Sequence, residues 1–127
     1  MATPHCIRVV DSITELNGQD AGCIAVSGSH GGLSSARYAQ AARPLLSVFN
    51  DAGGGLAGAG LAALGYLQSH SLAAGTVAHS SAKIGDGHST LATGKISGLN
   101  ACALALGLQE HWSCQQAVDF LLTTRKG

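Results

Sequence analysis

Residues 23–55, CIAVSGSHGGLSSARYAQAARPLLSVFNDAGGG, contain the clearest fold signal in the chain. Two continuous apolar runs of strand length, residues 23–27 and 45–50, are typical of strands that are buried on both faces of a parallel sheet. A serine-capped helix over residues 34–42 fits between them and ends before Pro44, because the residue that precedes a proline avoids helical geometry. This strand–helix–strand order predicts a parallel βαβ unit.

The rest of the sequence continues the alternation of strands and helices. Apolar runs predict strands at 5–10 and 72–79, and helical spacing predicts helices at 56–69, around 100–106 and at 114–124, the last capped by Ser113. A polar loop covers residues 80–90. We therefore expect one α/β domain over residues 1–127, built as a small Rossmann-like three-layer sandwich with about four mainly parallel strands.

The charge of the chain is low and balanced. Seven basic and seven acidic residues give a formal net charge of zero. Because the sequence has no basic stripe that would neutralise phosphates, we expect no nucleic-acid partner. Charged residues make up 11% of the chain, against about 25% in typical soluble domains. A bland surface favours a homo-oligomer or a subunit of a larger complex; a monomer with a Ser/Thr surface is the alternative.

The sequence also predicts where the protein is found. Polar residues 68–71 interrupt the longest uncharged stretch, residues 52–82, before it reaches the length that a bilayer needs. The first six residues lack the charged and apolar regions of a signal peptide. The cysteines, Cys6, Cys23, Cys102 and Cys114, form no CxxC pair, and their spacing supports neither zinc binding nor a disulfide framework. We expect a cytoplasmic protein with no membrane contact.

Ligands of open parallel sheets bind beyond the carboxyl ends of the strands. The first loop at such a position contains Ser27, Gly28, Ser29, His30, Gly31 and Gly32. Glycines at a strand–helix turn let backbone N–H groups approach an anion, which the following helix N-terminus also favours. The serines can donate hydrogen bonds, His30 can transfer a proton, and Arg37 can reach a carboxylate or phosphate. We expect an anion-binding loop; the alternative is a tight turn with a surface histidine.

The second loop begins with Asn50 and Asp51 at the end of a buried strand, a common position for a general base or an orienting group. Gly53, Gly55 and Gly58 match the GxGxxG spacing of dinucleotide-binding turns. The acidic residue that would bind the ribose about 20 positions later is missing, so we expect no nicotinamide cofactor. The alternative for Asp51 is a plain turn or capping residue.

The third loop, residues 79–88, is the densest cluster of titratable groups in the chain. It contains His79, Ser80, Ser81, Lys83, Asp86 and His88. We expect Lys83 to be drawn toward Asp51 or Asp86 and to hold an anionic substrate or donate a proton; an ordinary solvated lysine is the alternative. His79 is a stronger functional candidate than His88 because it lies at a strand end, whereas Asp86 between two glycines is also typical of a turn.

Together the loops predict a small-molecule enzyme, of the hydrolase or isomerase/lyase type, that applies acid–base chemistry to a polar, anionic substrate. His79 or His30 moves the proton, Asp51 orients it or acts as a base, and Lys83 and Arg37 hold the anion with the amides of the first loop. The alternative is a non-catalytic ligand-binding or regulatory subunit that cradles a phosphate or carboxylate. A third hypothesis is a structural interaction protein.

A metal site is a further alternative. His30, His79 and Asp51 come from loops that are expected to converge, and such a set can bind zinc or iron. The sequence has no HxH or HxxxH pair to support it. We therefore expect neither a metal nor a cofactor.

Overall fold

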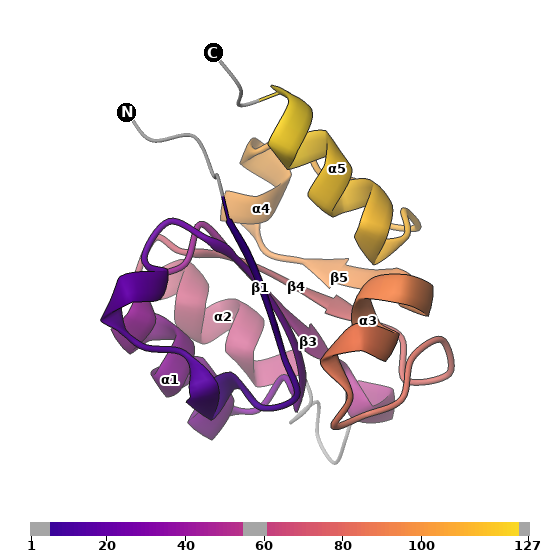
Figure 1. Ribbon diagram of the computed structural model, residues 1–127, viewed down its shortest axis with the longest axis horizontal. Coiled ribbons are helices and arrows are strands. Elements are labelled where there is room, and N and C mark those ends of the chain that lie inside the picture. The colour runs from indigo at the N-terminus through magenta and orange to yellow at the C-terminus, as the bar shows by residue number, and fades with distance from the viewer. Residues whose placement is uncertain (1–5, 55–60, 125–127) are drawn as a thin grey trace.

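A computed structural model describes residues 6–54 and 61–124 of the chain. Its centre is one five-stranded sheet in which the strands follow each other in chain order (Figure 1). The strands are β1 (Ile7–Val10), β2 (Ile24–His30), β3 (Leu46–Asn50), β4 (Ala73–Val77) and β5 (Ile96–Leu99). The first four are parallel, and β5 runs antiparallel to β4. The α/β class is confirmed, with one strand more than expected.

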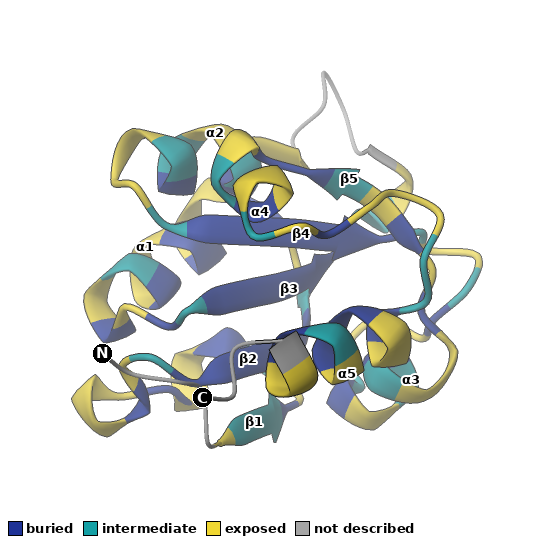
Figure 2. Ribbon diagram, turned by 90° about the horizontal axis from the view of Figure 1, so that it is seen from above, coloured by how far each residue is buried: buried dark blue, intermediate teal, exposed yellow. Residues whose placement is uncertain are grey.

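Helices cover both faces of this sheet. The 3-10 turns η1 (Ile13–Glu15) and η2 (Gly18–Asp20) and the helices α1 (Leu33–Ala42) and α2 (Ala62–Ser69) cover one face, and α3 (Gly87–Thr93) and α5 (Cys114–Thr124) cover the other. Figure 2 shows the buried central strands between these two layers. The strand order is sequential, whereas the dinucleotide-binding order reverses at a switch point inside the parallel sheet. In this sheet the strand order does not reverse; instead the last strand, β5, runs in the opposite direction to the other four.

The side chains of β2 show why continuous apolar runs predicted the buried strands correctly. Ile24 and Val26 belong to the core beneath α5, whereas Ala25 belongs to the core beneath α1 and α2. All three are completely buried. Successive strand residues point to opposite faces, so a strand that is covered on both sides needs apolar residues at every position.

Several local boundaries differ from the expectation. The strand β2 does not end at Ser27 but continues through Gly28 to His30. The helix α1 ends at Ala42, as expected, but its N-cap is Gly32 and no side chain caps it. Ser113 does cap α5, since its Oγ accepts a hydrogen bond from the N–H of Gln116 at 3.0 Å.

The segment after β4 contains two elements that the sequence did not predict. The helix α3 begins inside the expected polar loop and extends beyond it to Thr93; Asp86 caps it by accepting a hydrogen bond from Ser89 N–H at 3.0 Å. The strand β5 is four residues long, and Ser97 and Gly98 interrupt its apolar pattern. A run of four residues is too short to show the alternation of apolar and polar residues that predicts a strand. The position of β5 is determined by its pairing with β4. A short helix α4 (Ala101–Ala105) follows.

A disulfide joins Cys6 to Cys23, contrary to the expectation that the spacing of the cysteines supports no disulfide framework. The register that pairs Ile7 with Ile24 places the two residues before them side by side at the start of β1 and β2. Their Cα atoms are 5.1 Å apart, within the range that a disulfide spans. A separation of 17 residues carries no local sign of this pairing.

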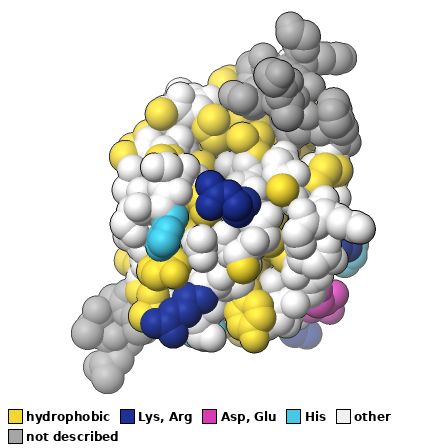
Figure 3. Space-filling model, turned by 90° about the vertical axis from the view of Figure 1, so that its left-hand side faces the viewer, with side chains coloured by type: hydrophobic (Ala, Val, Ile, Leu, Met, Phe, Trp, Pro, Cys, Tyr) yellow, Lys and Arg dark blue, Asp and Glu magenta, His cyan; other side chains and the backbone are white. Residues whose placement is uncertain are grey.

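The other two cysteines, Cys102 and Cys114, are free thiols. Burial raises the pKa of Cys114 to about 12. Among the described residues, no helix has the length and apolar character needed to cross a bilayer. Figure 3 shows one face of the molecule, on which the few charged side chains are separated by neutral surface.

Candidate functional site

The carboxyl ends of β2, β3 and β4 lie at the same edge of the sheet because these strands are parallel. The strand β5 is antiparallel to β4, so its first residues return to this edge, where Ile96 pairs with Val77. Four segments that are distant in sequence therefore meet here. The chemistry of the edge is concentrated around one carboxylate, Asp51, immediately after β3.

Asp51 receives hydrogen bonds on both carboxylate oxygens. Its Oδ1 accepts from the N–H of Gly53 at 2.8 Å and from the N–H of His79 at 3.0 Å, and its Oδ2 accepts from the Ser97 hydroxyl at 2.8 Å. Burial alone raises the pKa of Asp51, but these hydrogen bonds and the attraction of the His79 imidazole outweigh it and hold the pKa below its ordinary value of 3.8. The carboxylate is therefore ionised at neutral pH.

The imidazole of His79 lies beside this carboxylate. Its Nδ1 is 3.6 Å from Asp51 Oδ1; the His79 side chain is 62% exposed, whereas that of Asp51 is 14% exposed. The ring lies across Gly53, where an added Cβ would be 3.4 Å from Cε1, and Gly53 has a φ of +73° that side-chain-bearing residues rarely adopt. The structure thus brings together Asp51 and His79, with Nε2 as the ring nitrogen remote from the carboxylate.

Two hydroxyl groups continue the network behind Asp51. The Oγ of Ser97 lies 3.0 Å from Oγ1 of Thr76, which is completely buried in β4. Neither residue was among the predicted site residues. Thr76 lies inside the expected strand 72–79, three residues before its end, and Ser97 belongs to β5, which the sequence did not predict. A hydroxyl near the end of the expected strand was the available signal for Thr76.

The first loop is built differently from the expected anion cradle. The N–H of Gly31 donates to Asn50 O at 2.9 Å, and the N–H of Gly32 donates to His30 O at 2.8 Å. These two amides are therefore engaged within the protein. The Ser27 hydroxyl is buried and donates to Val48 O at 2.8 Å, while Ser29 Oγ accepts from Ile13 N–H at 2.9 Å.

Gly28 serves a close approach between two backbones. A Cβ at this position would collide with the backbone nitrogen of Asp86 and would lie 2.6 Å from the carbonyl carbon of Gly85. The N–H of Gly85 donates to Gly28 O at 2.7 Å. The glycine allows the third loop to pack directly on β2, which explains its presence without a ligand.

Among the described residues, no ion pair joins His30 or Arg37 to the Asp51–His79 pair, although the register of β2 and β3 places His30 opposite Asn50. The His30 ring is exposed and folds over Gly32, where an added Cβ would be 2.7 Å from Nε2. Arg37 is exposed on α1. Within the described part of the chain, neither forms an ion pair with Asp51 or with any other carboxylate.

The amide of Asn50 ties the second loop to the third. Its Nδ2 donates to Ala82 O at 3.2 Å, its Oδ1 accepts from Ala52 N–H at 2.8 Å, and the residue is completely buried. Ser81 similarly donates to Ala78 O and accepts from Lys95 N–H. These polar groups shape the loops around the site.

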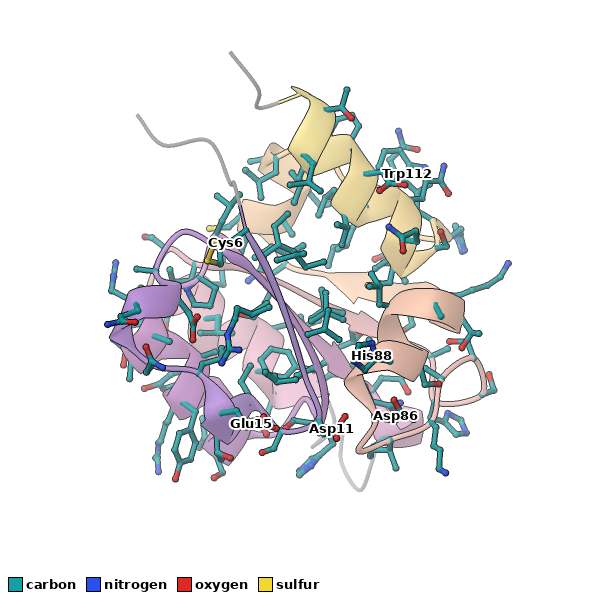
Figure 4. All side chains as sticks on the ribbon, viewed as in Figure 1. Cys6, Asp11, Glu15, Asp86, His88 and Trp112 are labelled. Carbon is teal, nitrogen blue, oxygen red and sulfur yellow. A yellow bond between two sulfur atoms is a disulfide. The ribbon has the colours of Figure 1, made fainter. Side chains whose placement is uncertain are left out.

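Two carboxylates, those of Asp86 and Asp11, accept hydrogen bonds from the backbone at the end of the third loop and the start of α3. Figure 4 shows both at this end of the molecule. Asp86 caps α3, and Asp11 Oδ1 accepts from Gly87 N–H at 3.0 Å. A Cβ at Gly87 would collide with the backbone of Val10, so the loop is held against β1 as well as β2.

Lys83 does not pair with either carboxylate that the sequence analysis proposed. It is exposed, and the ion pairs of the described residues do not include it. Its backbone N–H donates to Ser89 Oγ at 2.8 Å, which fixes the loop while the side chain extends outward. Ser80, next to His79, is exposed too.

No group of three or more His, Cys, Asp or Glu side chains in the described part of the chain is arranged to hold a metal ion. Gly55 and Gly58 of the GxGxxG spacing lie outside the described residues. Comparison of the chain with protein-family models, with curated proteins and with solved structures finds no match.

Proposed function

We propose that this protein is a small-molecule enzyme in which His79 acts as general base and acid and Asp51 orients it. The observation that carries the proposal is the 3.6 Å approach of His79 Nδ1 to a carboxylate whose other contacts are already fixed. An ionised carboxylate beside an exposed imidazole is the arrangement that activates histidine for proton transfer. It lies at the sheet edge where α/β proteins bind ligands.

The proton moves through the exposed nitrogen of the ring. His79 Nε2 accepts a proton from water or from the substrate, and the resulting imidazolium is stabilised by the neighbouring Asp51 carboxylate. The same nitrogen then returns the proton to the leaving group or to another atom of the substrate. This sequence suits a hydrolase or an isomerase/lyase, and general acid–base catalysis of this kind contributes about 10²–10⁴-fold to the rate.

The proposed substrate is a small, polar, anionic molecule. Lys83 and Ser80 support this because both are exposed on the loop that carries His79. His30 and Arg37, also exposed, stay candidates for substrate contact. By contrast, the polar groups of Ser27, Ser29, Asn50, Ser81 and Asp86 bond within the protein, so we assign them to the scaffold.

The test compares wild type with His79→Gln on chromogenic probes, namely p-nitrophenyl esters of short carboxylic acids and p-nitrophenyl phosphate. We expect hydrolysis by the wild type and a loss of about 10²–10⁴-fold in His79→Gln. Thr123→Ala, on the exposed side of α5, is the control for general surface effects. If turnover is equal in wild type and His79→Gln, or absent from both, the acid–base proposal is overturned for these substrates.

The alternative, a ligand-binding or regulatory subunit, predicts a different result. In that case phosphate or a small carboxylate binds equally to wild type and His79→Gln, and no turnover accompanies binding. Calorimetric titration with inorganic phosphate and with acetate separates the two functions. The homo-oligomer expected from the low content of charged residues also stays a prediction.

The cellular location now has evidence on both sides. The sequence predicted a cytoplasmic protein, but the Cys6–Cys23 disulfide is of a kind that persists in oxidising compartments and is rare in the cytosol. We therefore propose that the protein resides in an oxidising environment. Mass mapping of the protein from its native source should find the Cys6–Cys23 disulfide, and free thiols at both positions would overturn the proposal.

A further inference from the structure

We propose that Ser97 and Thr76 are positioning residues that fix the Asp51 carboxylate toward His79 through a relay of two hydroxyl groups. The inference rests on the proposed function, because it concerns the same proton-transferring pair. It adds Ser97 of β5, which contacts Asp51, and Thr76 of β4, which contacts Ser97. It also assigns a direction to each of these hydrogen bonds.

The direction follows from the donors that are available. An ionised carboxylate only accepts hydrogen bonds, so the hydrogen of Ser97 points to Asp51 Oδ2 at 2.8 Å. A hydroxyl has one hydrogen, and Ser97 has used its own. The hydrogen of the 3.0 Å contact between Ser97 and Thr76 must therefore come from Thr76. The relay runs from the buried strand toward the carboxylate.

The relay restricts the rotation of the carboxylate. The last side-chain torsion of an aspartate is broad, so a carboxylate that is held by one oxygen can still turn. Gly53 and His79 hold Oδ1 through their N–H groups, and Ser97 holds Oδ2. With both oxygens fixed, Oδ1 stays next to the imidazole.

A separate feature of β5 supports the same arrangement. Gly98 faces Thr76, and a Cβ there would be 3.1 Å from Thr76 Oγ1 and 3.2 Å from a methyl group of Leu64. A side chain at this position would crowd the hydroxyl that donates to Ser97. The glycine thus leaves room for the buried part of the relay.

The first measurement needs no substrate. The pKa of Asp51 is determined by ¹³C NMR titration of its carboxyl carbon in wild type, Ser97→Ala and Ser97→Thr. We expect Ser97→Ala to raise the pKa of Asp51, because one of the hydrogen bonds that lowers it is removed. Ser97→Thr keeps the hydroxyl and should preserve the low pKa. An unchanged pKa in Ser97→Ala overturns the relay.

Thr76 is tested by Thr76→Val, which keeps the shape of the side chain and removes the hydroxyl, and by Thr76→Ser, which keeps the hydroxyl. We expect Thr76→Val to raise the pKa of Asp51 by less than Ser97→Ala does, and Thr76→Ser to leave it low. The Thr76→Ser result holds even if Thr76→Val folds poorly, and a raised pKa in Thr76→Ser contradicts the assignment. Thr123→Ala on the exposed side of α5 is the control.

Turnover of the p-nitrophenyl probes separates this inference from the proposed function. We expect kcat to fall by about tenfold in Ser97→Ala, with KM nearly unchanged, as for the loss of one hydrogen bond to a charged group. If the pKa of Asp51 changes as expected but neither the wild type nor any variant hydrolyses the p-nitrophenyl probes, the enzyme proposal fails and the relay stands. If activity needs His79 but Ser97→Ala keeps full kcat, the relay fails alone.

Discussion

His79 donates its backbone N–H to Asp51 Oδ1 at 3.0 Å and places its ring Nδ1 3.6 Å from the same oxygen, although the two residues are 28 positions apart. One carboxylate oxygen therefore accepts a hydrogen bond from the backbone of the histidine and lies within ion-pair distance of its ring. This double contact joins the ends of β3 and β4 and determines where the imidazole lies.

Asp51→Asn should strongly reduce turnover. An amide in place of the carboxylate presents either an uncharged oxygen or an NH₂ group to the imidazole, so a protonated His79 loses its stabilising partner. We expect kcat to fall by about 10²–10⁴-fold, as for loss of the proton-transferring group itself, with a smaller change in KM. Steady-state kinetics on the p-nitrophenyl probes give both constants. A variant with wild-type kcat would show that the carboxylate is not used.

Asp51 also makes stability depend on pH. Because its pKa is lower in the folded protein than the ordinary 3.8, the ionised form favours the folded state. This contribution is complete above the unfolded pKa and is lost as the pH falls through the folded value. Urea unfolding of wild type and Asp51→Asn from pH 6 to pH 2 should show the largest difference at pH 6 and a decreasing one below pH 4. A difference that does not vary with pH would contradict the lowered pKa.

Gly28→Ala should destabilise the fold. The added methyl group would collide with the backbone nitrogen of Asp86, and neither β2 nor the third loop can move away cheaply. We expect a loss of about 1–3 kcal/mol in the free energy of unfolding. Gly18→Ala is the matched control because nothing lies within 4 Å of a Cβ there. Equal unfolding curves for the two variants would exclude the close packing.

The free thiols should differ in reactivity. Cys114 is completely buried with a pKa of about 12, whereas Cys102 is half-buried. Since the thiolate is the reactive form, Ellman's reagent at pH 8 should modify Cys102 in the folded protein and Cys114 only after unfolding. Cys102→Ala should remove the reaction of the folded protein, and rapid reaction of that variant would show that Cys114 is accessible.

The Cys6–Cys23 disulfide should stabilise the protein by restricting its unfolded state. For a separation of 17 residues, we expect reduction to lower the free energy of unfolding by about 3 kcal/mol. Urea unfolding with and without dithiothreitol measures the difference. The double variant Cys6→Ala/Cys23→Ala should not respond to the reductant. A wild type that is equally stable in both conditions would show that the bond is not formed.

The features of this protein that depend on local pattern could be predicted from the amino-acid sequence. Apolar runs around Val26 and Val48 indicated strands buried on both faces, and the parallel arrangement placed Asp51 and His79 at one edge. The α/β class and the proximity of Asp51 and His79 follow from these signals, because buried strands and polar strand ends are properties of short segments.

The features that depend on pairing between distant segments became visible only in the folded structure. The antiparallel return of β5 brought Ser97 to Asp51, and the register of β1 with β2 brought Cys6 to Cys23. The packing of the third loop on β2 gave Gly28 a structural role, and bonding to Asn50 O engaged an amide expected to bind an anion. No local pattern encodes these contacts, because strand register and loop packing are set by the whole core.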